Sequence, residues 1–216
     1  DTPPGIDRVF RSETEIALGI YRTQLFGPDD LNLICGYRLD VVVHHDSQLD
    51  WLAQTPLITP LDVWLKLDTG MHRLGVTSAD VDAFHRRLQA CKQARPEPVL
   101  CTHFAAADDL QGEQTAAQLA EFERLCADLP GARSAANSAA VMAWPAAHCD
   151  WVRPGYMLYG NSPLPAAHPN SVKLRPVMTL VSAVTGLRDV APENPLCPRT
   201  GCGWHSVSRT ARSIHR

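Results

Sequence analysis

Residues 62–70, DVWLKLDTG, decide how the fold of this chain is interpreted. The run is apolar through its middle, as strands buried on both faces of a parallel sheet tend to be, and it stops at an Asp-Thr-Gly turn. Similar runs recur at residues 40–45, 99–104 and 132–137, with a weaker candidate at residues 151–155. Because longer amphipathic segments separate several of them, the pattern predicts repeated β/α units and an α/β fold.

Two segments between the strands have the apolar spacing of helices. Residues 78–94 carry theirs at Val81, Phe84, Leu88 and Cys91, and we expect Thr77 or Ser78 to cap this helix. Residues 112–128 are expected to present one side made of Ala116, Leu119, Phe122 or Glu123, and Cys126.

Composition excludes several classes of protein. The chain has 216 residues, a formal net charge of -3 and 45% hydrophobic residues, which is ordinary for a globular protein. No run reaches the ~18 to 20 apolar residues of a membrane span. The 20 basic residues are balanced by 23 acidic ones, and the basic residues form no stripe of the kind that binds nucleic acid. We therefore expect neither a membrane nor a nucleic-acid partner.

The seven cysteines are scattered and form no Cys-x-x-Cys pair. This favours free, packed thiols in a reducing compartment over disulfides or metal ligands. No apolar segment of a secretory signal follows the charges of residues 1–13. These features predict a cytoplasmic protein without a metal. His44, His45 and Asp46 are open to two interpretations, a polar strand end or a metal site.

Polar residues follow the predicted strands at the edge where β/α proteins gather their functional groups. Asp68, His103 and Asn137 each close a strand. Lys66 lies inside an apolar strand, where a bare ammonium is costly to bury without a partner. Arg73 follows on the loop, so two cations are expected to lie close together. Asp68 could instead pair with either cation, and the glycines of the loop could be simple turn residues.

Three further motifs admit a functional and a structural interpretation. The small residues after His103 leave room for a planar ligand beside its imidazole. Asn137 and Ser138 begin a short helix, which suits an anion but is equally suited to an ordinary cap. Arg153-Pro154-Gly155 combines a guanidinium with a stiff turn and a glycine that lets backbone approach a ligand.

Taken together and in this order, these motifs resemble the alanine racemases. Residues 37–45 and 174–180 add support, and the resemblance covers roughly residues 28–190. The blocks that carry it are residues 66–75, 102–105, 137–139, 153–155 and 158–160.

The resemblance implies an architecture. Alanine racemases have an N-terminal (β/α)8 barrel that holds pyridoxal 5'-phosphate, then a β-rich domain, in a head-to-tail homodimer. We therefore expect an incomplete TIM-type barrel in residues 1–180. Residues 181–216 would be the start of the second domain, with at most its first strand. From about Val190 the sequence has no apolar periodicity, which is typical of a disordered tail. Dimerisation is in doubt without a complete second domain.

The resemblance also implies roles in catalysis. Lys66 would be the strand lysine that is carbamylated in many members, and the resulting anion would orient Arg73. Arg73 would hold the cofactor's phenolic oxygen and the substrate carboxylate. His103 would stack on the pyridine ring. Arg73 and His103 are thus the expected catalytic residues, with L-alanine and D-alanine as substrates.

The remaining motif residues would bind the cofactor. Arg153 would hydrogen-bond to the pyridine nitrogen and keep it largely unprotonated, because a guanidinium does not readily release a proton. Ser138, with backbone groups of Gly155 and Tyr156, would hold the phosphate. Asn137 would lie beside this group.

Two departures from the family pattern concern the proton-transfer bases. The chain has no lysine before Lys66 and no tyrosine after Tyr159. We therefore expect the family's Schiff-base lysine and its partner-face tyrosine both to be absent. An interrupted or frame-shifted gene, with residues 1–27 also out of register, would explain this.

Three hypotheses remain. The first is an incomplete, inactive copy of an alanine racemase, the enzyme that supplies D-alanine for peptidoglycan. The second is a non-catalytic barrel protein that binds pyridoxal phosphate weakly. The third is a vestigial chain that aggregates through the strand edges of an opened barrel.

Overall fold

A computed structural model describes residues 26–179, 181 and 183. The chain divides into two compact units, Asp1–Met178 and Thr179–Arg216. Almost all described residues belong to the first unit. The expected disordered tail lies outside the described residues, as do Cys197 and Cys202, and the assignment of residues 1–180 and 181–216 to two domains stays a prediction.

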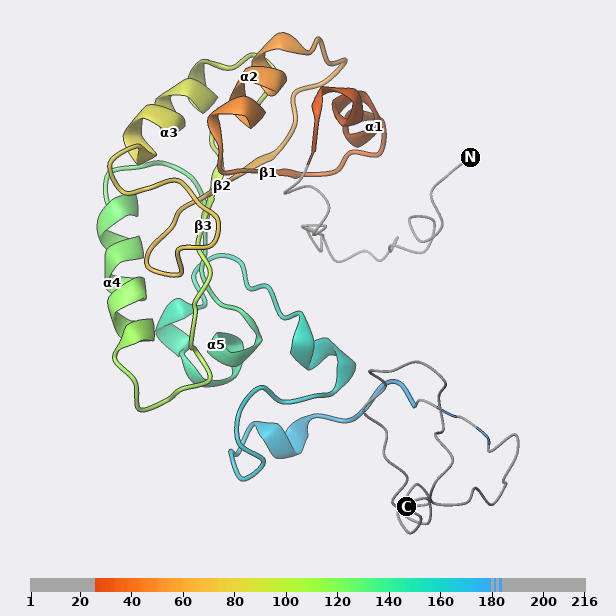
Figure 1. Cartoon of the computed structure of the whole chain (residues 1–216), viewed down its shortest axis with the longest axis vertical. Helices are drawn as coiled ribbons and strands as arrows, with labels where there is room; N and C mark the ends of the chain where they lie inside the picture. The colour runs from red at the N-terminus through yellow and green to blue at the C-terminus, as the bar shows by residue number, and fades with distance from the viewer. Residues whose placement is uncertain (1–25, 180, 182, 184–216) are drawn as a thin grey trace, which may run out of the picture. The chain divides into compact units, whose positions relative to one another are not determined.

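The first unit is built on a parallel sheet with the strand order β1-β2-β3-β4 (Figure 1). Its strands match the first four sequence predictions but are shorter, at Val41–Val43, Val63–Lys66, Val99–Cys101 and Arg133–Ser134. The weaker candidate at residues 151–155 contributes only one bridge, between Ser134 and Trp151, and no strand. The α/β fold with β/α alternation is confirmed.

The two faces of the sheet bury different partners. Val43, Leu65 and Leu100 face the main core, together with apolar residues of the helices. The helices α2, α3 and α4, at Asp46–Gln54, Val81–Ala90 and Gln114–Cys126, cover this face (Figure 1). On the opposite face Trp64 and Cys101 form a smaller cluster with neighbouring apolar side chains. Burial on both faces explains why these strands read as continuous apolar runs.

Short elements complete the unit. The helix α1 spans Leu31–Gly36 and follows the 3-10 turn η2, Pro28–Asp30. The helix α5 spans Ser138–Ala143. Three more 3-10 turns follow it, η3 at Pro145–Ala147, η4 at Tyr156–Tyr159 and η5 at Ser171–Lys173. None of the helices in the described part of the chain is long and apolar enough to cross a membrane.

Helix boundaries correct two expectations. Asp80, and neither Thr77 nor Ser78, precedes α3; the Thr77 hydroxyl donates to the Asp80 carboxylate at 2.7 Å and closes a turn before the helix. In α4 the residues Ala116 and Glu123 are exposed. Its buried face is made of Thr115, Gln118, Leu119, Phe122 and Cys126. The prediction was right for Leu119, Phe122 and Cys126 and wrong for Ala116, whose place on the buried face is taken by Thr115.

Gly75 folds the loop after β2 back onto the strand. Its φ of 143° lies in the region that favours glycine, and a Cβ there would lie 2.6 Å from the Asp68 backbone nitrogen. The next residue, Val76, donates to the Lys66 carbonyl at 2.8 Å and accepts from the Asp68 N–H at 2.9 Å. This return holds the loop residues 68–75 at the carboxyl end of the sheet.

Candidate active site

Lys66, at the end of β2, lies in a polar row across one face of the sheet. It pairs in register with Cys101, which pairs with Ser134 on β4. Lys66 is only 6% exposed. Burial lowers the pKa of its ammonium, and the nearby Arg73 and Arg153 act in the same direction, while Cys101 and Asp68 partly oppose the shift. The predicted proximity of Lys66 and Arg73 is consistent with this coupling.

Arg153 crosses the carboxyl ends of β3 and β4. Its guanidinium donates to the Thr102 carbonyl, to the Ser134 hydroxyl and, at 3.3 Å, to the Ala135 carbonyl. Its backbone N–H donates to the Ala136 carbonyl at 2.9 Å. A guanidinium has five N–H donors, so these three acceptors do not use all of them. Donors of Arg153 therefore remain for a ligand.

His103 follows β3 and is half-buried. Burial lowers the pKa of its imidazole to about 4, and Arg153, Lys66 and Arg73 contribute to the lowering in that order. Near pH 7 the ring is therefore neutral. A neutral aromatic ring beside three cations suits a planar anionic ligand better than a cationic one.

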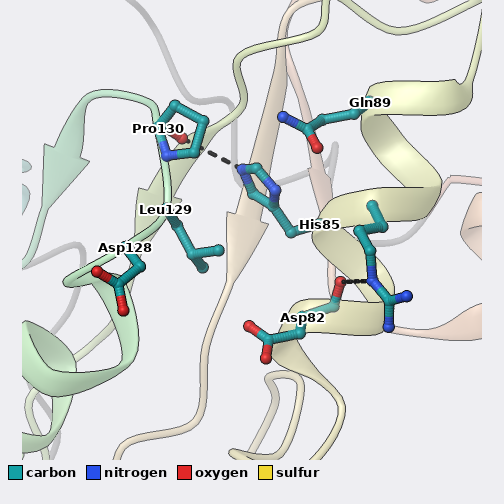
Figure 2. Close-up of a pocket in the computed structure, with 7 residues that line it drawn as sticks. Asp82, His85, Gln89, Asp128, Leu129 and Pro130 are labelled. Carbon is teal, nitrogen blue, oxygen red and sulfur yellow. Dashed lines mark hydrogen bonds between the residues drawn. The ribbon is translucent and has the colours of Figure 1, made fainter.

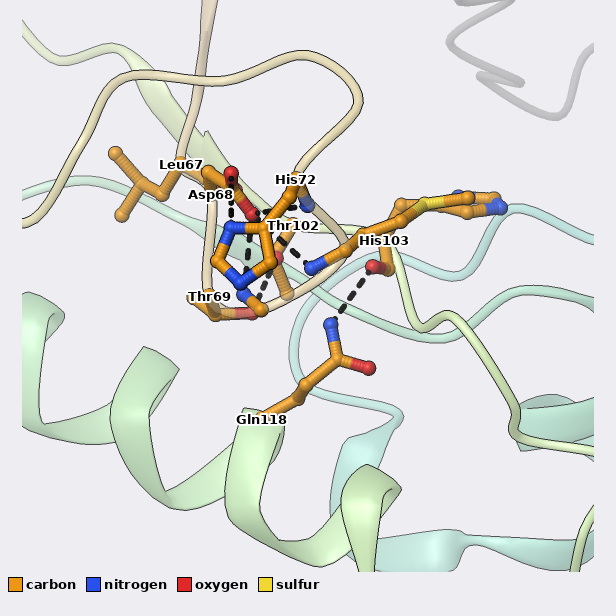
Figure 3. A network of polar contacts seen from close by, with 9 residues as sticks. Leu67, Asp68, Thr69, His72, Thr102, His103 and Gln118 are labelled. Carbon is orange, nitrogen blue, oxygen red and sulfur yellow. Dashed lines mark hydrogen bonds and ion pairs between the residues drawn. The ribbon is translucent and has the colours of Figure 1, made fainter.

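Asp68 organises the loop that carries Arg73 (Figure 3). Its Oδ1 accepts the N–H groups of Gly70, Met71 and His72 at 3.0–3.1 Å, and its Oδ2 lies 3.1 Å from the His72 ring. Burial alone would raise the pKa of Asp68, but these hydrogen bonds outweigh it and the pKa is lowered. In the described structure the Asp68 carboxylate makes its ion pair with His72 and not with Lys66 or Arg73, although it still acts on Lys66 electrostatically.

Two buried threonines tie this loop to β3. The hydroxyls of Thr69 and Thr102 lie 2.7 Å apart, and the Thr102 hydroxyl donates to the Leu67 carbonyl at 3.1 Å (Figure 3). The Thr102 carbonyl in turn accepts from Arg153. Hydrogen bonds on both sides of Thr102 therefore link the loop of Arg73 to Arg153.

Asn137 and Ser138 bring the end of β4 next to η4. Asn137 caps α5, with its Oδ1 accepting the Ala140 N–H at 3.1 Å. The Ser138 hydroxyl accepts the Met157 N–H at 3.2 Å. Gly155 begins this turn, and a Cβ placed on it would meet nothing within 4 Å. Backbone N–H groups and a hydroxyl thus meet beside open space.

The charges of the site are unbalanced. Lys66, Arg73 and Arg153 are coupled to one another and to His103. None of Lys66, Arg73 and Arg153 has an ion pair within the described residues, and the ion pair of the neighbouring loop joins Asp68 to His72. Three cations that act on one neutral ring outnumber the single carboxylate, Asp68, that acts on Lys66, and such an excess of positive charge is suited to an anionic ligand.

Comparison with known proteins identifies the family. Residues 12–163 match the model of the alanine racemase N-terminal domain. The alanine racemase of Shewanella baltica strain OS185 is 44% identical over 189 residues, which are 88% of this chain and 52% of that protein. The chain belongs to the alanine racemase family. The resemblance expected from the sequence motifs is confirmed.

Solved alanine racemases share the fold. The biosynthetic enzyme of Pseudomonas aeruginosa superposes with a TM-score of 0.65 at 43% identity and covers 70% of this chain and 42% of that one. The Acinetobacter baumannii enzyme superposes with a TM-score of 0.61 at 32% identity, covering 71% and 43%. The sheet and its helices are therefore part of the N-terminal barrel of the alanine racemases, as expected.

The chain spans about half the length of the curated relatives that it matches. The family match begins at residue 12, upstream of the residue 28 expected from the motifs. This start speaks against an out-of-register segment between residues 12 and 27.

A cavity of about 300 Å³ lies away from this site (Figure 2). It is lined by α3 and by the loop that enters β4, including His85, Asp128 and Pro130. His85 is 2% exposed, and its Nε2 lies 3.2 Å from the Pro130 carbonyl oxygen. Because this loop precedes β4, the cavity lies at the end of the strand opposite to the one that carries the site.

Metal binding receives no support from the described residues, in which no group of three His, Cys, Asp or Glu side chains converges. His45 begins α2, and its Nδ1 accepts the Ser47 N–H at 3.2 Å. The five cysteines in the described part of the chain, Cys35, Cys91, Cys101, Cys126 and Cys149, are free thiols.

Sequence reasoning missed Thr69, Thr102 and Gln118. For Gln118 a signal was present, because it falls between Thr115 and Phe122 on the buried face of α4. A polar residue at an apolar position of a helix needs a hydrogen-bonding partner.

Proposed function

We propose that this chain supplies the cofactor-binding barrel segment of an alanine racemase, which interconverts L-alanine and D-alanine with pyridoxal 5'-phosphate. One observation carries the proposal: Lys66, Arg73 and Arg153 all act electrostatically on the neutral ring of His103, and none of the three has an ion pair within the described residues. The cofactor brings a phosphate and a phenolic oxygen, and the substrate brings a carboxylate. These anions match the charge of the site.

The residues of the site fit the cofactor. Ser138 and the backbone N–H groups of Gly155 and Tyr156 would hold the phosphate, since the space beside Gly155 is open. Asn137 would fix the strand end beside them through its cap of α5. His103 would stack on the pyridine ring.

Arginines would hold the rest of the ligand. Arg153 would use a remaining N–H to bind the pyridine nitrogen. Arg73 would bind the phenolic oxygen and the substrate carboxylate. When bound, pyridoxal phosphate supplies the electron sink that makes the Cα–H of an amino acid acidic.

Lys66 is the proposed carbamylation site. Its lowered pKa favours the free amine, whose lone pair forms a C–N bond to the carbon of CO₂ while the electron pair of one C=O π bond moves to oxygen and one N–H proton is released to solvent. The resulting carbamate is an anion, so it would neutralise the cationic surroundings and orient Arg73. A cation that is costly to bury would become a partner for two arginines.

These 216 residues alone are expected to bind the cofactor without racemising alanine. Racemisation requires proton transfer on two faces of the substrate. The lysines of the chain are Lys66, Lys92 and Lys173, and its last tyrosine is Tyr159. Neither family base has a counterpart among them, and a non-catalytic pyridoxal-phosphate-binding protein is the second candidate. Homodimerisation, a cytoplasmic location and a role in peptidoglycan supply stay predictions.

Titration of the purified chain with pyridoxal 5'-phosphate tests the proposal. We expect saturable binding, measured through the quenching of tryptophan fluorescence. Inorganic phosphate should weaken this binding. Arg73→Ala is expected to weaken binding about tenfold, since a charged hydrogen bond contributes ~1.5–3 kcal/mol. L-alanine is expected to remain unracemised.

Arg86→Ala is the matched control, because Arg86 is likewise an exposed arginine and lies on α3 beside the remote cavity. Its variant should bind the cofactor as the unaltered chain does. Absence of saturable binding, or equal affinity in the two arginine variants, would overturn the proposal.

A further inference from the structure

Gln118 is a buried polar side chain whose position packing alone does not explain. It is 2% exposed on the buried face of α4, beside the apolar Leu119, Phe122 and Cys126 and the small polar Thr115. An amide at such a position is costly unless it is hydrogen-bonded. Its partners therefore indicate its role.

Both ends of the Gln118 amide bind the loop that follows β3. Its Oε1 accepts the Ala105 N–H at 2.9 Å, and its Nε2 donates to the His103 carbonyl at 3.2 Å. The Ala105 N–H can only donate, which fixes the orientation of the amide. Figure 3 shows the side chain of Gln118 rising from α4 to the His103 carbonyl. The amide thus holds the two peptide groups on either side of Phe104.

Other side chains hold the rest of this loop. Phe104 is 2% exposed and anchored in the main core. Its carbonyl accepts from Asn137 Nδ2 at 3.4 Å, and the Thr102 carbonyl accepts from Arg153. The backbone around His103 is therefore fixed at successive residues. Within the described residues the imidazole of His103 has no hydrogen bond, so its position follows from that of its backbone.

A second glutamine, Gln48, binds the backbone at the end of β1 in a similar way. Gln48 on α2 accepts the His44 N–H at 2.9 Å and donates to the Val42 carbonyl at 3.3 Å. In both cases the glutamine lies on the helix after the strand and binds the backbone of a histidine at the strand end. The repetition indicates a device for placing a strand-end ring.

We propose that Gln118 is a positioning residue for His103, holding its imidazole where the ring of a bound pyridoxal phosphate would stack. The inference rests on the proposed function for the identity of that ligand. The placement of His103 itself does not depend on it. Gln118 acts through the backbone of residues 103–105 and does not itself contact the ligand.

The test compares Gln118→Met with Gln114→Met in the full chain. Methionine keeps the length of the side chain but cannot bind the loop. Gln114 is exposed one turn earlier on the same helix, so it controls for the same chemical change. The first readout is the pKa of His103, measured by NMR in the absence of cofactor. The His103 signal is identified as the one that is missing in His103→Gln. The second is amide hydrogen exchange at Ala105.

We expect the pKa of His103, about 4 in the unaltered chain, to rise toward the ordinary value of about 6.5 in Gln118→Met alone. Exchange at Ala105 should become at least tenfold faster, and affinity for pyridoxal 5'-phosphate should fall several-fold. An unchanged His103 pKa and unchanged exchange in a folded Gln118→Met variant would overturn the inference. If the unaltered chain binds no cofactor, the proposed function fails while the His103 titration still decides this inference.

Gln118→Glu decides the matter if Gln118→Met does not fold. A protonated carboxyl accepts from Ala105 and donates to the His103 carbonyl, whereas the ionised form can only accept. Protection of the Ala105 amide should therefore increase as pH falls through the pKa of the new carboxyl. Protection that matches the unaltered chain at every pH would contradict the positioning role.

Discussion

Lys66 and Cys101 lie side by side in register on β2 and β3, both buried at the carboxyl end of the sheet. Burial raises the pKa of the Cys101 thiol, although Arg153 and Lys66 oppose the shift, so this neighbour stays neutral. The in-register neighbour of the buried Lys66 therefore supplies no counter-charge, and the Asp68 carboxylate that acts on Lys66 is hydrogen-bonded within its own loop. We therefore expect Lys66 to destabilise the fold as long as no anion is bound beside it.

Lys66→Met should stabilise the chain in CO₂-free buffer near pH 7. Methionine fills a similar volume without the desolvation cost of an ammonium, and replacing buried charges by apolar groups commonly stabilises by about 1–3 kcal/mol. Urea unfolding followed by circular dichroism measures the change. Lys92→Met is the control, because Lys92 is exposed and its variant should differ by less than ~0.5 kcal/mol. A destabilised Lys66→Met chain in the absence of CO₂ would refute the argument.

Bicarbonate should stabilise the unaltered chain at alkaline pH. The lowered pKa of Lys66 increases the fraction of free amine, and carbamate formation then supplies an anion between arginines. Any group that binds only the folded state raises stability by mass action. With ¹³C-bicarbonate, a carbamate carbon signal should appear in the unaltered chain and be missing in Lys66→Met. If bicarbonate stabilises the unaltered chain and Lys66→Met equally, it acts as a salt and not through a carbamate on Lys66.

The fold was largely predictable because its strands are buried on both faces. Such strands read as apolar runs, and residues 62–70 marked the strand, its end and its loop together. The helix α2 was missed, since it begins with a histidine cap and its short apolar pattern comes directly after β1. Residues 151–155 looked like a strand but form only a single bridge at Trp151.

The site was predictable only in part, because single residues announce a strand end but not their partners. Lys66, Arg73, His103 and Arg153 were expected to converge, and their mutual electrostatic coupling is consistent with this, although their roles stay proposals. The pairing of Arg153 with the Thr102 carbonyl joins residues far apart in sequence. No local pattern encodes such a contact.

Acid should weaken the fold through His103. Its folded pKa of about 4 lies below the ordinary value of about 6.5, so between these values the unfolded chain binds more protons than the folded one. Stability conferred by the neutral ring is therefore present above about pH 6.5 and is lost as pH falls toward 4, by at most roughly 3 kcal/mol. Burial lowers the pKa of His44 as well, and its contribution has the same sign.

Urea unfolding between pH 4 and 7.5 measures this dependence. His103→Gln should lose part of the slope, and the slope that remains should come partly from His44. If the stability of His103→Gln changes with pH as steeply as that of the unaltered chain, His103 is not responsible for the pH dependence.

Asn137 joins two parts of the site, and two substitutions separate its contacts. Its Oδ1 caps α5 through the Ala140 N–H, and its Nδ2 donates to the Phe104 carbonyl at 3.4 Å. Asn137→Ala removes both and should cost about 1–2 kcal/mol, the usual effect of losing a cap and a hydrogen bond. Asn137→Asp keeps the cap acceptor and should cost about 0.5–1 kcal/mol.

The free energies of unfolding of both variants, compared with that of Asn32→Ala at an exposed position of α1, measure the two contributions. Because the Phe104 carbonyl belongs to the loop of His103, Asn137→Asp should also raise the rate of amide exchange at Ala105. If Asn137→Asp destabilises the chain as much as Asn137→Ala does, the cap contributes nothing. The contact with Phe104 would then be the sole stabilising interaction of this side chain.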